Sequence, residues 1–422
     1  MTDFLIPRTL RVLTPLWAAL WLAGFAAGLG TVTKGVGFLP LLMVLPWFGW
    51  WLYQRRRGRP VDGPHPATLL WLVPAFLLGV AVWLAPLGWA LLHEPSASLQ
   101  AYAHELLFKQ TGTRYANAWH HRQPAWYYLQ VILTLWLPGS LLLPMLARPW
   151  WRRLHRGDRR QWLLLGWALL VLVFFTASPG KREVYVLPML PAMALAAAPL
   201  LPGLLRRLCV RRYLFGYSLV LVLATGALGI LLLAGHPWAQ AQLERRAMPE
   251  TLLPVLGGGL LAFAALLGSL VAWLRVRGAA PLVLLAQGML WMLYGLVLIP
   301  ALDPYASASA LMHRVGARIG PDAELALVAW REQNLLQADR PVREFGFKRA
   351  WAEQWHDAGP WLAEAPEKRW VLVLDKAMSP CVDPVQVIEI GIANRNRWQL
   401  LPGSAWDPQC HAERAGATAE ED

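Results

Sequence analysis

The sequence predicts an all-α polytopic membrane protein with about nine transmembrane helices and a small C-terminal α/β or α+β domain outside the membrane. Three observations predict this fold class. The 422-residue chain is 56% hydrophobic and contains 25 Trp. Residues 1–302 break into apolar stretches close to the roughly 20 residues that a membrane-crossing helix needs. Residues 303–422 contain no such stretch and alternate helix-like with strand-like segments.

The apolar stretches predict helices rather than a barrel, because they contain Pro and Gly and lack the two-residue alternation of barrel strands. Internal prolines such as Pro46, Pro86 and Pro138 predict kinked helices. The expected spans are residues 12–31, 36–53, 68–92, 125–147, 161–177, 184–203, 213–235, 252–274 and 280–301.

Basic residues cluster in every second loop between these spans, which predicts a cytoplasmic N-terminus and a C-terminal domain on the outer side. The net charge is +13 for the whole chain. This excess lies in residues 1–302, where we interpret it as setting topology and meeting anionic membrane lipids. We therefore expect no nucleic-acid partner. The basic clusters are Arg8 and Arg11; Arg55, Arg56, Arg57 and Arg59; Arg148, Arg152, Arg153, Arg156, Arg159 and Arg160; Arg206, Arg207, Arg211 and Arg212; Arg275 and Arg277.

The C-terminal segment predicts a soluble domain over residues 303–414, followed by a disordered tail at 415–422. Cys381 and Cys410 both lie in this domain, on the predicted outer side, where oxidation is permitted. We predict a disulfide between them, and a free thiol at Cys209. The expected elements are helices at 306–319 and 348–363 and strands at 324–330, 370–375 and 385–392.

The longest outer loop, residues 93–124, contains an unusual density of His, Arg and aromatic residues. Its histidines could ligate a divalent metal with help from Glu94 or Glu105, or they could be solvated interfacial residues. Arg114 and Arg122 carry planar guanidinium groups suited to phosphate oxygens or to lipid headgroups. The histidines of the loop are His93, His104, His120 and His121.

Two further outer turns carry cations against the overall trend. Lys34 is the only charge between the first two predicted spans, so it either meets an anion or extends to water. In the turn Ser178–Glu183, Lys181 and Arg182 are adjacent and follow a Pro-Gly pair that lets backbone amides face a ligand. This turn predicts an anion site, and the alternative is that Glu183 offsets one of its charges.

Three runs of residues carry a family resemblance. They are Gly28–Gly35; Arg114-Tyr115 followed by His121–Tyr128; and Gly180–Pro188 with Pro191-Ala192. Together they resemble the bacterial aminoarabinose transferase and protein O-mannosyltransferase-like family, which are GT-C membrane glycosyltransferases. The resemblance covers most of residues 10–205, and the later spans and the outer domain agree in layout.

The resemblance implies transfer of a sugar from a polyprenyl-phosphate carrier to a lipid A, protein or glycan acceptor at the periplasmic face of the bacterial inner membrane. It implies no nucleotide cofactor. A histidine near a divalent metal is implied at His121, although the residues before the Arg-aromatic pair, where one branch of the family has its metal histidine, are Thr111-Gly112-Thr113 here. The positions that the resemblance implies for the lipid phosphate are Lys34, Arg114, Lys181 and Arg182. Arg122 and Tyr185 are further candidates for binding the donor, from the chemistry of their side chains and their place in the outer loops.

The sequence departs from the family at the first outer loop, where family members have an acidic residue that can accept a proton from the acceptor or orient it. The first outer turn here, Thr31–Val36, contains no Asp or Glu, so we assign no catalytic base. Family layout also has about four more spans upstream. We therefore expect an N-terminally shortened member, explained by a start codon assigned too late, by a true inactive truncation or by a split enzyme, and we favour the first.

Outer aromatic residues could stack on the sugar, although an interfacial aromatic belt explains most of them. Two other functions remain as alternatives. One is a non-catalytic subunit or pseudoenzyme, because the acidic loop is missing. The other is a flippase or transporter of lipid-linked sugars, which the near absence of charges inside the spans disfavours. The aromatic residues are Trp89, Trp119, Trp126, Tyr127 and Tyr185.

Overall fold

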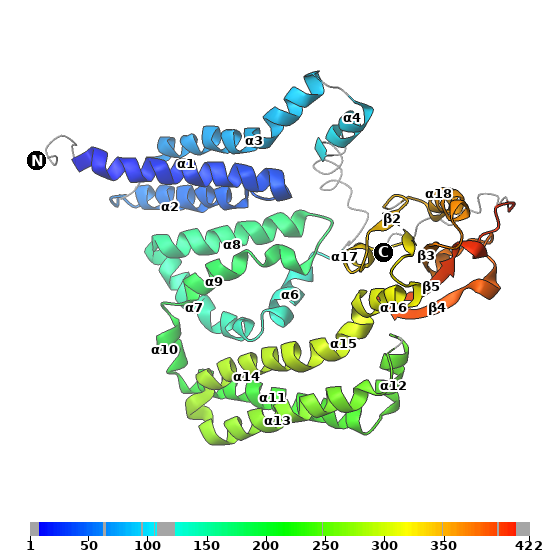
Figure 1. Cartoon of the computed structure of the whole chain (residues 1–422). Helices are drawn as coiled ribbons and strands as arrows, with labels where there is room; N and C mark the ends of the chain where they lie inside the picture. The colour runs from blue at the N-terminus through cyan, green and yellow to red at the C-terminus, as the bar shows by residue number, and fades with distance from the viewer. Residues whose placement is uncertain are drawn as a thin grey trace, which may run out of the picture. The chain divides into compact units, whose positions relative to one another are not determined.

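The computed structural model describes residues 8–61, 65–93, 96–104, 106–107, 123–246, 248–347, 349–394 and 396–410. They form two compact units, Met1–Val210 and Arg211–Asp422. The first unit is helical, and the second combines helices with a sheet (Figure 1). This division falls in the sequence within the helix Leu208–Leu233, and the domain boundary expected at residue 302 stays a prediction.

The first unit contains α-helices linked by short 3₁₀ turns. Several of these elements have a proline at their first or second position, where its missing N–H costs nothing. The 3₁₀ turns are Leu39–Met43, Pro66–Trp71, Gly139–Leu142 and Glu183–Val186. The described helices are α1 (Arg8–Lys34), α2 (Val44–Arg56), α3 (Leu72–His93), α4 (Ala97–His104), α6 (Tyr127–Leu135), α7 (Leu143–Arg156), α8 (Arg159–Ala177), α9 (Met189–Ala197) and α10 (Leu201–Leu205).

Helices α1 and α3 lie side by side (Figure 1) and approach closely at glycines. A Cβ added to Gly28 would collide with the carbonyl oxygen of Phe76, and one added to Gly79 would collide with that of Phe25. Small residues at a crossing allow such backbone contact between membrane helices. Gly28, the first residue of the Gly28–Gly35 run, is therefore needed for helix packing.

One buried cluster of the first unit, here the Tyr128 cluster, joins the segment after α1 to α6, α8 and α9. The indole Nε1 of Trp167 donates to the carbonyl oxygen of Leu39 at 2.8 Å, and the rings of Phe38 and Phe174 meet at 5.6 Å. This cluster supports the cationic turn Ser178–Glu183. Its buried residues are Leu39, Tyr128, Val131, Ile132, Trp136, Trp167, Ala168, Val171, Phe175, Val186, Met189 and Ala192.

The second unit begins with long apolar helices. A π-helical turn, Tyr294–Leu298, joins α14 to α15. The buried residues between α13 and α14, here the α13–α14 cluster, are Phe263, Leu267, Val271, Leu282, Ala286 and Leu293. These helices are α11 (Leu208–Leu233), α12 (Pro237–Glu244), α13 (Leu252–Leu274), α14 (Ala279–Leu293) and α15 (Ile299–Ala306).

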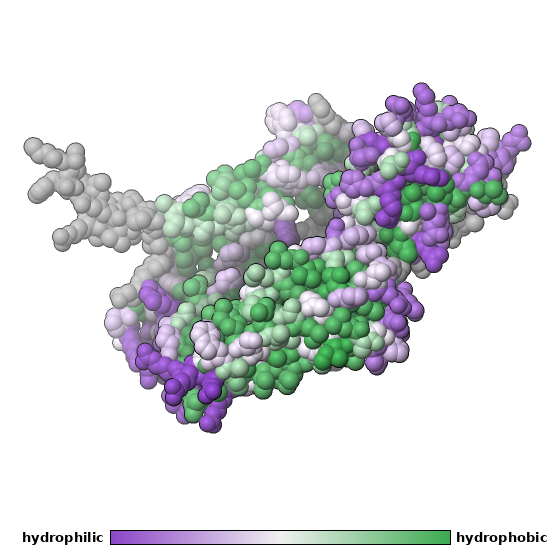
Figure 2. Space-filling model, turned by 60° about the horizontal axis from the view of Figure 1, so that its bottom comes forward, coloured by the Kyte–Doolittle hydropathy of each residue, from purple (hydrophilic) through white to green (hydrophobic). Residues whose placement is uncertain are grey.

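Five described helical segments are long and apolar enough to cross a membrane, and a sixth counts if α6 and Gly139–Arg156, bent by 102°, form one broken span. Figure 2 shows hydrophobic residues over the outer surface of the second unit's helices and hydrophilic ones over its sheet. The chain is thus a mostly helical polytopic membrane protein with a small C-terminal sheet. The five are Pro66–His93, Arg159–Ala177, Leu208–Leu233, Leu252–Leu274 and Val276–Ala306.

The expected count of nine spans is not confirmed. The stretch 36–53 is divided into the 3₁₀ turn Leu39–Met43 and the 13-residue helix α2. The stretch 184–203 is divided into a 3₁₀ turn and the short helices α9 and α10, which contain or follow prolines. Hydropathy marks both stretches as apolar, but prolines interrupt the helix that a span needs.

The C-terminal domain is built on a five-stranded mixed sheet in the order β2-β1-β3-β5-β4. Strand β1 is parallel to β2 and β3, whereas β5 is antiparallel to β3 and β4. Helices α16 and α18 contribute to its buried interior, here the sheet core. The elements are α16 (Ser309–Ile319), β1 (Glu324–Val328), α17 (Glu332–Leu336), β2 (Val342–Glu344), α18 (Trp351–Glu364), β3 (Arg369–Leu374), β4 (Ile388–Ala393) and β5 (Asn396–Pro402).

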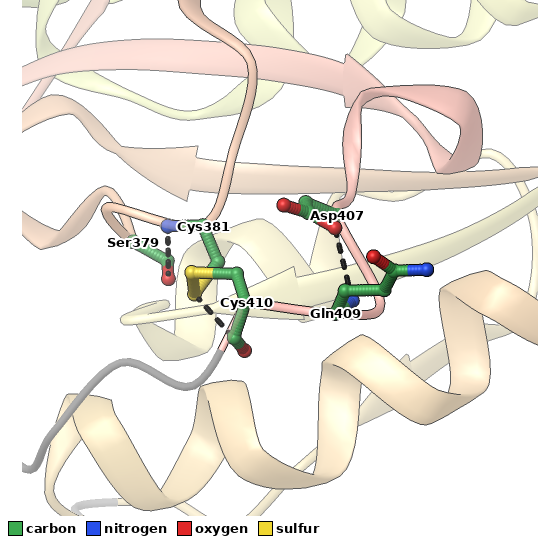
Figure 3. Close-up of a disulfide and its surroundings, with 5 residues drawn as sticks. All are labelled: Ser379, Cys381, Asp407, Gln409 and Cys410. Atoms are coloured by element: carbon green, nitrogen blue, oxygen red, sulfur yellow. Dashed lines mark hydrogen bonds between the residues drawn. A yellow bond between two sulfur atoms is a disulfide. The ribbon is translucent and has the colours of Figure 1, made fainter.

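Each predicted helix and strand of this domain has a counterpart in the structure. The structure also joins Cys381 to Cys410 in a disulfide with the Cα atoms 5.5 Å apart (Figure 3). The N–H of Cys381 donates to Ser379 Oγ at 3.2 Å, and the N–H of Gln409 donates to Asp407 Oδ1 at 2.9 Å. Cys209, at the start of α11, is an exposed free thiol.

Candidate functional site

The cationic turn Ser178–Glu183 connects α8 to the 3₁₀ turn Glu183–Val186. Helix α8 ends at Ala177 because Ser178 adopts an extended conformation. The Ser178 hydroxyl then donates to the carbonyl oxygen of Gly180 at 3.3 Å, and Val186 enters the Tyr128 cluster with no exposed surface. The turn is therefore fixed at its start by a local hydrogen bond and at its end by an apolar anchor.

Lys181 is buried, with 6% of its surface exposed. Its Nζ donates a hydrogen bond of 3.0 Å to the carbonyl oxygen of Gln123. A buried ammonium requires a strong acceptor, and a charge-assisted bond of this kind is about twice as strong as a neutral one. Lys181 thus fastens the turn to the segment that leads into α6.

A second bond joins the same two segments. The Tyr127 hydroxyl, at the start of α6, donates to Glu183 Oε2 at 3.1 Å. Glu183 is exposed, and it has a further interaction besides the one with Tyr127. The alternative that Glu183 offsets a charge of the turn stays open, but part of its hydrogen-bonding capacity goes to Tyr127.

Two more aromatic residues lie under the turn. Tyr185 is half-buried and stacks on Phe175 with the ring centroids 5.0 Å apart. Tyr128 is 1% exposed, and its hydroxyl lies against the backbone of Arg182. Tyr128 therefore supports the backbone of the turn from within the buried cluster.

Arg182 is the cation that the turn presents to the surface, since its side chain is exposed while that of Lys181 is buried. The residue also has interactions within the protein. Two adjacent residues of like charge therefore have different surroundings. Lys181 binds backbone inside the unit, whereas Arg182 is exposed.

Lys34 is exposed at the C-terminal end of α1. The chain reverses immediately after it, because Gly35 has a φ of 70° and Gly37 lies against the backbone of Gly30 so closely that a Cβ would collide. Val36 then packs against the Tyr128 cluster, which also receives Tyr185. The fold thus attaches both cationic turns to one apolar cluster.

Several predicted site residues lie outside the described residues. They are Glu94, Glu105, Arg114, Trp119, His120, His121 and Arg122. Among the described residues, no group of three or more His, Cys, Asp and Glu side chains could hold a metal ion. The metal expected at His121 therefore stays a prediction.

Trp89 and Trp126 are each 67% exposed. Trp89 stacks on His93 at 3.8 Å, and His93 Nδ1 lies 2.9 Å from the Trp89 carbonyl oxygen. Large exposed aromatic side chains at helix ends are typical of an interfacial belt. For these two residues the structure favours the belt over sugar stacking.

The C-terminal domain contains a cavity of about 530 Å³. Arg349 Nη1 donates to Asp357 Oδ2 at 2.8 Å, and this bond holds the pKa of that carboxyl below its ordinary value. Charges of both signs are paired here. The lining residues are Arg343, Glu344, Phe345, Gly346, Arg349, His356, Asp357 and Pro360.

The sequence did not indicate the backbone carbonyl of Gln123 as the partner of Lys181. Every residue has a backbone carbonyl, whatever its side chain, so the sequence cannot single one out. It also did not single out Tyr128 from the Trp126-Tyr127-Tyr128 run. The one available signal was the position of this run inside a motif. The structure assigns Tyr127 to a hydrogen bond and Tyr128 to the buried cluster.

No protein-family model matches the chain. Among curated proteins, it is 32% identical over 232 residues to undecaprenyl phosphate-alpha-4-amino-4-deoxy-L-arabinose arabinosyl transferase 1 of Pseudomonas fluorescens. The matched region covers 54% of this chain and 38% of the relative. It is 30% identical over 305 residues to the transferase of the same name from Aeromonas salmonicida, with 69% of this chain and 51% of the relative covered. The chain thus spans about half or less of these relatives.

Among solved structures, the chain is similar to ArnT from Cupriavidus metallidurans bound to undecaprenyl phosphate. The TM-score is 0.62 at 16% identity, over 97% of this chain and 72% of that chain. This likeness shows a shared fold. Together with the sequence matches, it confirms the resemblance to the aminoarabinose transferases that the three motif runs predict.

Proposed function

We propose that this chain, a homologue of the bacterial aminoarabinose transferases, takes part in transfer of a sugar from a polyprenyl-phosphate carrier to a lipid A, protein or glycan acceptor. The observation that carries the proposal is the fastened cationic turn. Arg182 is exposed, while hydrogen bonds of Lys181 and Tyr127 hold the turn in place. The donor and acceptor are the partners of the reaction, together with membrane lipids.

The chemistry needs little more than placed cations. The acceptor oxygen attacks the anomeric carbon, the bond from that carbon to the phosphate oxygen breaks, and the polyprenyl phosphate leaves with the electron pair. Cations fixed where this negative charge develops lower the barrier without proton transfer. An acceptor that is itself a phosphate is already anionic near neutral pH and requires no strong base.

Of the two cations in the turn, Arg182 is the one that we expect at the phosphate. Its exposure and its planar set of donors suit phosphate oxygens. Lys181 has one of its three N–H groups directed to Gln123, so we assign it to positioning. Lys34 supplies a second exposed cation at a helix end attached to the same cluster. Arg114 and Arg122 remain proposed donor-binding residues.

The membrane placement proposed here follows the charge distribution. The arginine-rich loops face the cytoplasm, so the N-terminus is cytoplasmic, and the cationic turn and the C-terminal domain are periplasmic. The apolar outer surfaces of the helices supply a path for the polyprenyl chain. In this arrangement the phosphate reaches the turn at the membrane surface.

The test is a transfer assay with the full-length chain in lipid nanodiscs. Undecaprenyl phosphate-linked aminoarabinose is the donor, lipid A is the acceptor, and the mass gain of lipid A is the readout. Arg182→Gln should lower transfer by about a hundredfold, the usual effect of losing one donor to a developing oxyanion. The matched control is Arg206→Gln, which removes an exposed arginine elsewhere.

Lys181→Met should lower transfer as well, but Lys181→Gln, which keeps a donor for the Gln123 carbonyl, should retain more of it. Equal activity of the wild type and the three turn variants Arg182→Gln, Lys181→Met and Lys181→Gln would refute the role of the turn. If the wild-type chain binds the labelled donor without transferring the sugar, transfer by this chain is refuted. That result would favour the non-catalytic alternative.

A further inference from the structure

The clearest feature outside the proposed site is the corner between α7 and α8, which the end of α2 contacts. The last carbonyl groups of any helix lack partners within the helix. At the end of α7 they accept hydrogen bonds from side chains of α2, the segment after it, and α8. The bonds are Trp162 Nε1 to Leu154 O at 2.9 Å, Tyr53 Oη to His155 O at 2.7 Å, Arg59 Nη1 to Arg156 O at 3.1 Å and Trp50 Nε1 to Gly157 O at 2.8 Å.

Gly157 fixes the corner itself. Its φ of 78° is in the left-handed region that favours glycine, and Gln54 packs against it at 2.8 Å from where a Cβ would lie. Asp158 then caps α8 by accepting from the N–H of Arg160 at 3.1 Å. Residues 50–59 and 148–160 are thus held together by hydrogen bonds, and we call them the arginine junction.

The arginine junction carries a concentrated positive charge. Its one acidic residue, Asp158, is occupied by the helix cap and by Arg153 at 3.4 Å. The negative end of the α7 dipole and its carbonyl groups favour cations here, but they carry only a fraction of a charge. The junction thus has ten arginines and one aspartate, and this excess of positive charge attracts anionic lipids. The arginines are Arg55, Arg56, Arg57, Arg59, Arg148, Arg152, Arg153, Arg156, Arg159 and Arg160.

Aromatic rings hold some of these guanidinium groups in place. Arg55 lies 5.0 Å from the ring centroid of Trp51, and Arg57 lies 4.7 Å from that of Tyr53. Because Arg57 also donates to the carbonyl oxygen of His155 at 3.5 Å, its position is set from two sides. A guanidinium held in this way loses less side-chain entropy when it binds a phosphate.

Apolar surface adjoins the charge. Trp151 is 64% exposed and Phe48 is 46% exposed. The candidate span Arg159–Ala177 starts at the junction, which puts the arginines at the depth of lipid headgroups. A soluble anion would use the arginines alone, whereas a lipid would use both the arginines and the neighbouring aromatic side chains.

We propose that the arginine junction is a binding site for an anionic phospholipid, with the headgroup phosphate between the guanidinium groups of Arg55–Arg59 and those after α7, and an acyl chain along Trp151 and Phe48. The site is separate from the cationic turn, and the proposal does not depend on sugar transfer. The bound lipid joins α2 to the α7–α8 corner on one side of the first unit.

The test is native mass spectrometry of the full-length chain in mild detergent, offered equal amounts of phosphatidylglycerol and phosphatidylcholine. The wild type should prefer phosphatidylglycerol. Arg57→Gln/Arg59→Gln keeps amide donors for the α7 carbonyls but removes two charges, and it should lower the bound phosphatidylglycerol by roughly tenfold. Arg55→Gln/Arg56→Gln removes two charges without touching those carbonyl bonds and should have a similar effect.

The matched control is Arg206→Gln/Arg207→Gln, which removes two exposed arginines from another basic cluster. Its phosphatidylglycerol binding should remain within about twofold of wild type, since one site holds most of the preference. An equal loss in the control would overturn the proposal, because the preference would then reflect total charge. Displacement of the lipid by excess inorganic phosphate would also overturn it, because the site would then recognise a free anion.

Discussion

The sheet core and the α13–α14 cluster contain the same kinds of side chain, but they face different surroundings. In the C-terminal domain, Leu372 of β3 is fully buried and charged pairs cover the outside. In the helical region, Leu267 of α13 is equally buried, but the outer face of the same helix is apolar too, with Leu266 61% exposed and Trp273 78% exposed.

The difference separates two sources of stability. The sheet core gains free energy by removing apolar surface from water, at about 25 cal/mol per Å². Between membrane helices this driving force is absent, because lipid tails are as apolar as leucine, and close packing has to replace it. Equal burial in the two regions therefore does not imply equal stabilisation.

The largest effect should come from Leu372→Ala. The lost transfer free energy and the cavity should together cost the C-terminal domain about 2–5 kcal/mol. Hydrogen exchange on peptides that cover β3, in the full-length chain, measures this as a lower free energy of local opening. The matched variant Leu267→Ala, in lipid nanodiscs, should cost clearly less at α13. Equal losses would contradict the comparison.

The disulfide should produce the next largest effect. Cys381 and Cys410 are 29 residues apart, and closing a loop of this length restricts the unfolded chain by about 3.6 kcal/mol. Cys381→Ser/Cys410→Ser should therefore lower the free energy of opening of β3 and β5 by about that amount. The free energy of opening of peptides from α13 should not change. The control variant Cys209→Ser should change the free energy of opening in neither region. An effect on α13 would show that the two regions unfold together.

The outer face of α13 offers the reverse test. Leu266 is exposed near the middle of a candidate span, where an arginine should cost about 2.5–3.5 kcal/mol in a bilayer. Leu266→Arg should sharply reduce the full-length protein that is recovered as a single species from membranes. The matched variant Val385→Arg, at a residue 88% exposed in the C-terminal domain, should be recovered like wild type. Equal recovery would place α13 in water.

The C-terminal domain was predicted well because alternation and helical periodicity there reflect one water-excluded core. The helix expected at 348–363 is α18 (Trp351–Glu364), and the strand expected at 324–330 is β1 (Glu324–Val328). Two strands were missed. Strand β2 has only three residues at the sheet edge, none of them buried, and β5 includes Arg397 and Gln399, which obscure an apolar pattern.

The helical region was predicted less well. Hydropathy indicates that a segment lies in apolar surroundings, but it does not indicate whether the segment is one continuous helix. Residues 184–203 are apolar throughout, but their prolines divide them into short elements. The sequence also could not predict the different surroundings of the two cations in the cationic turn. Lys181 and Arg182 are neighbours in sequence, and only the fold places one inside against Gln123 and the other outside.

The smallest effect concerns the ion pairs that cover the sheet domain. Asp339 accepts from Arg340 Nε at 2.8 Å, and this bond lowers the pKa of the carboxyl below its ordinary value of 3.8. A carboxyl whose pKa is lower in the folded state than in the unfolded state stabilises the fold at pH values above its unfolded-state pKa. This contribution disappears as the pH falls through the lower, folded-state pKa. Because Asp339 is 39% exposed, water screens the pair and the contribution should stay below about 1 kcal/mol.

Wild type and Asp339→Asn should therefore differ in the free energy of opening of peptides around β2 near neutral pH, and the difference should shrink below about pH 4. The helices should show no such change, because the α13–α14 cluster contains no ionisable side chain. A difference that grew on acidification would reverse the sign expected for this carboxyl. It would mean that the fold stabilises the protonated form of Asp339. Surface ion pairs would then not contribute to the stability of the C-terminal domain in the way that we infer.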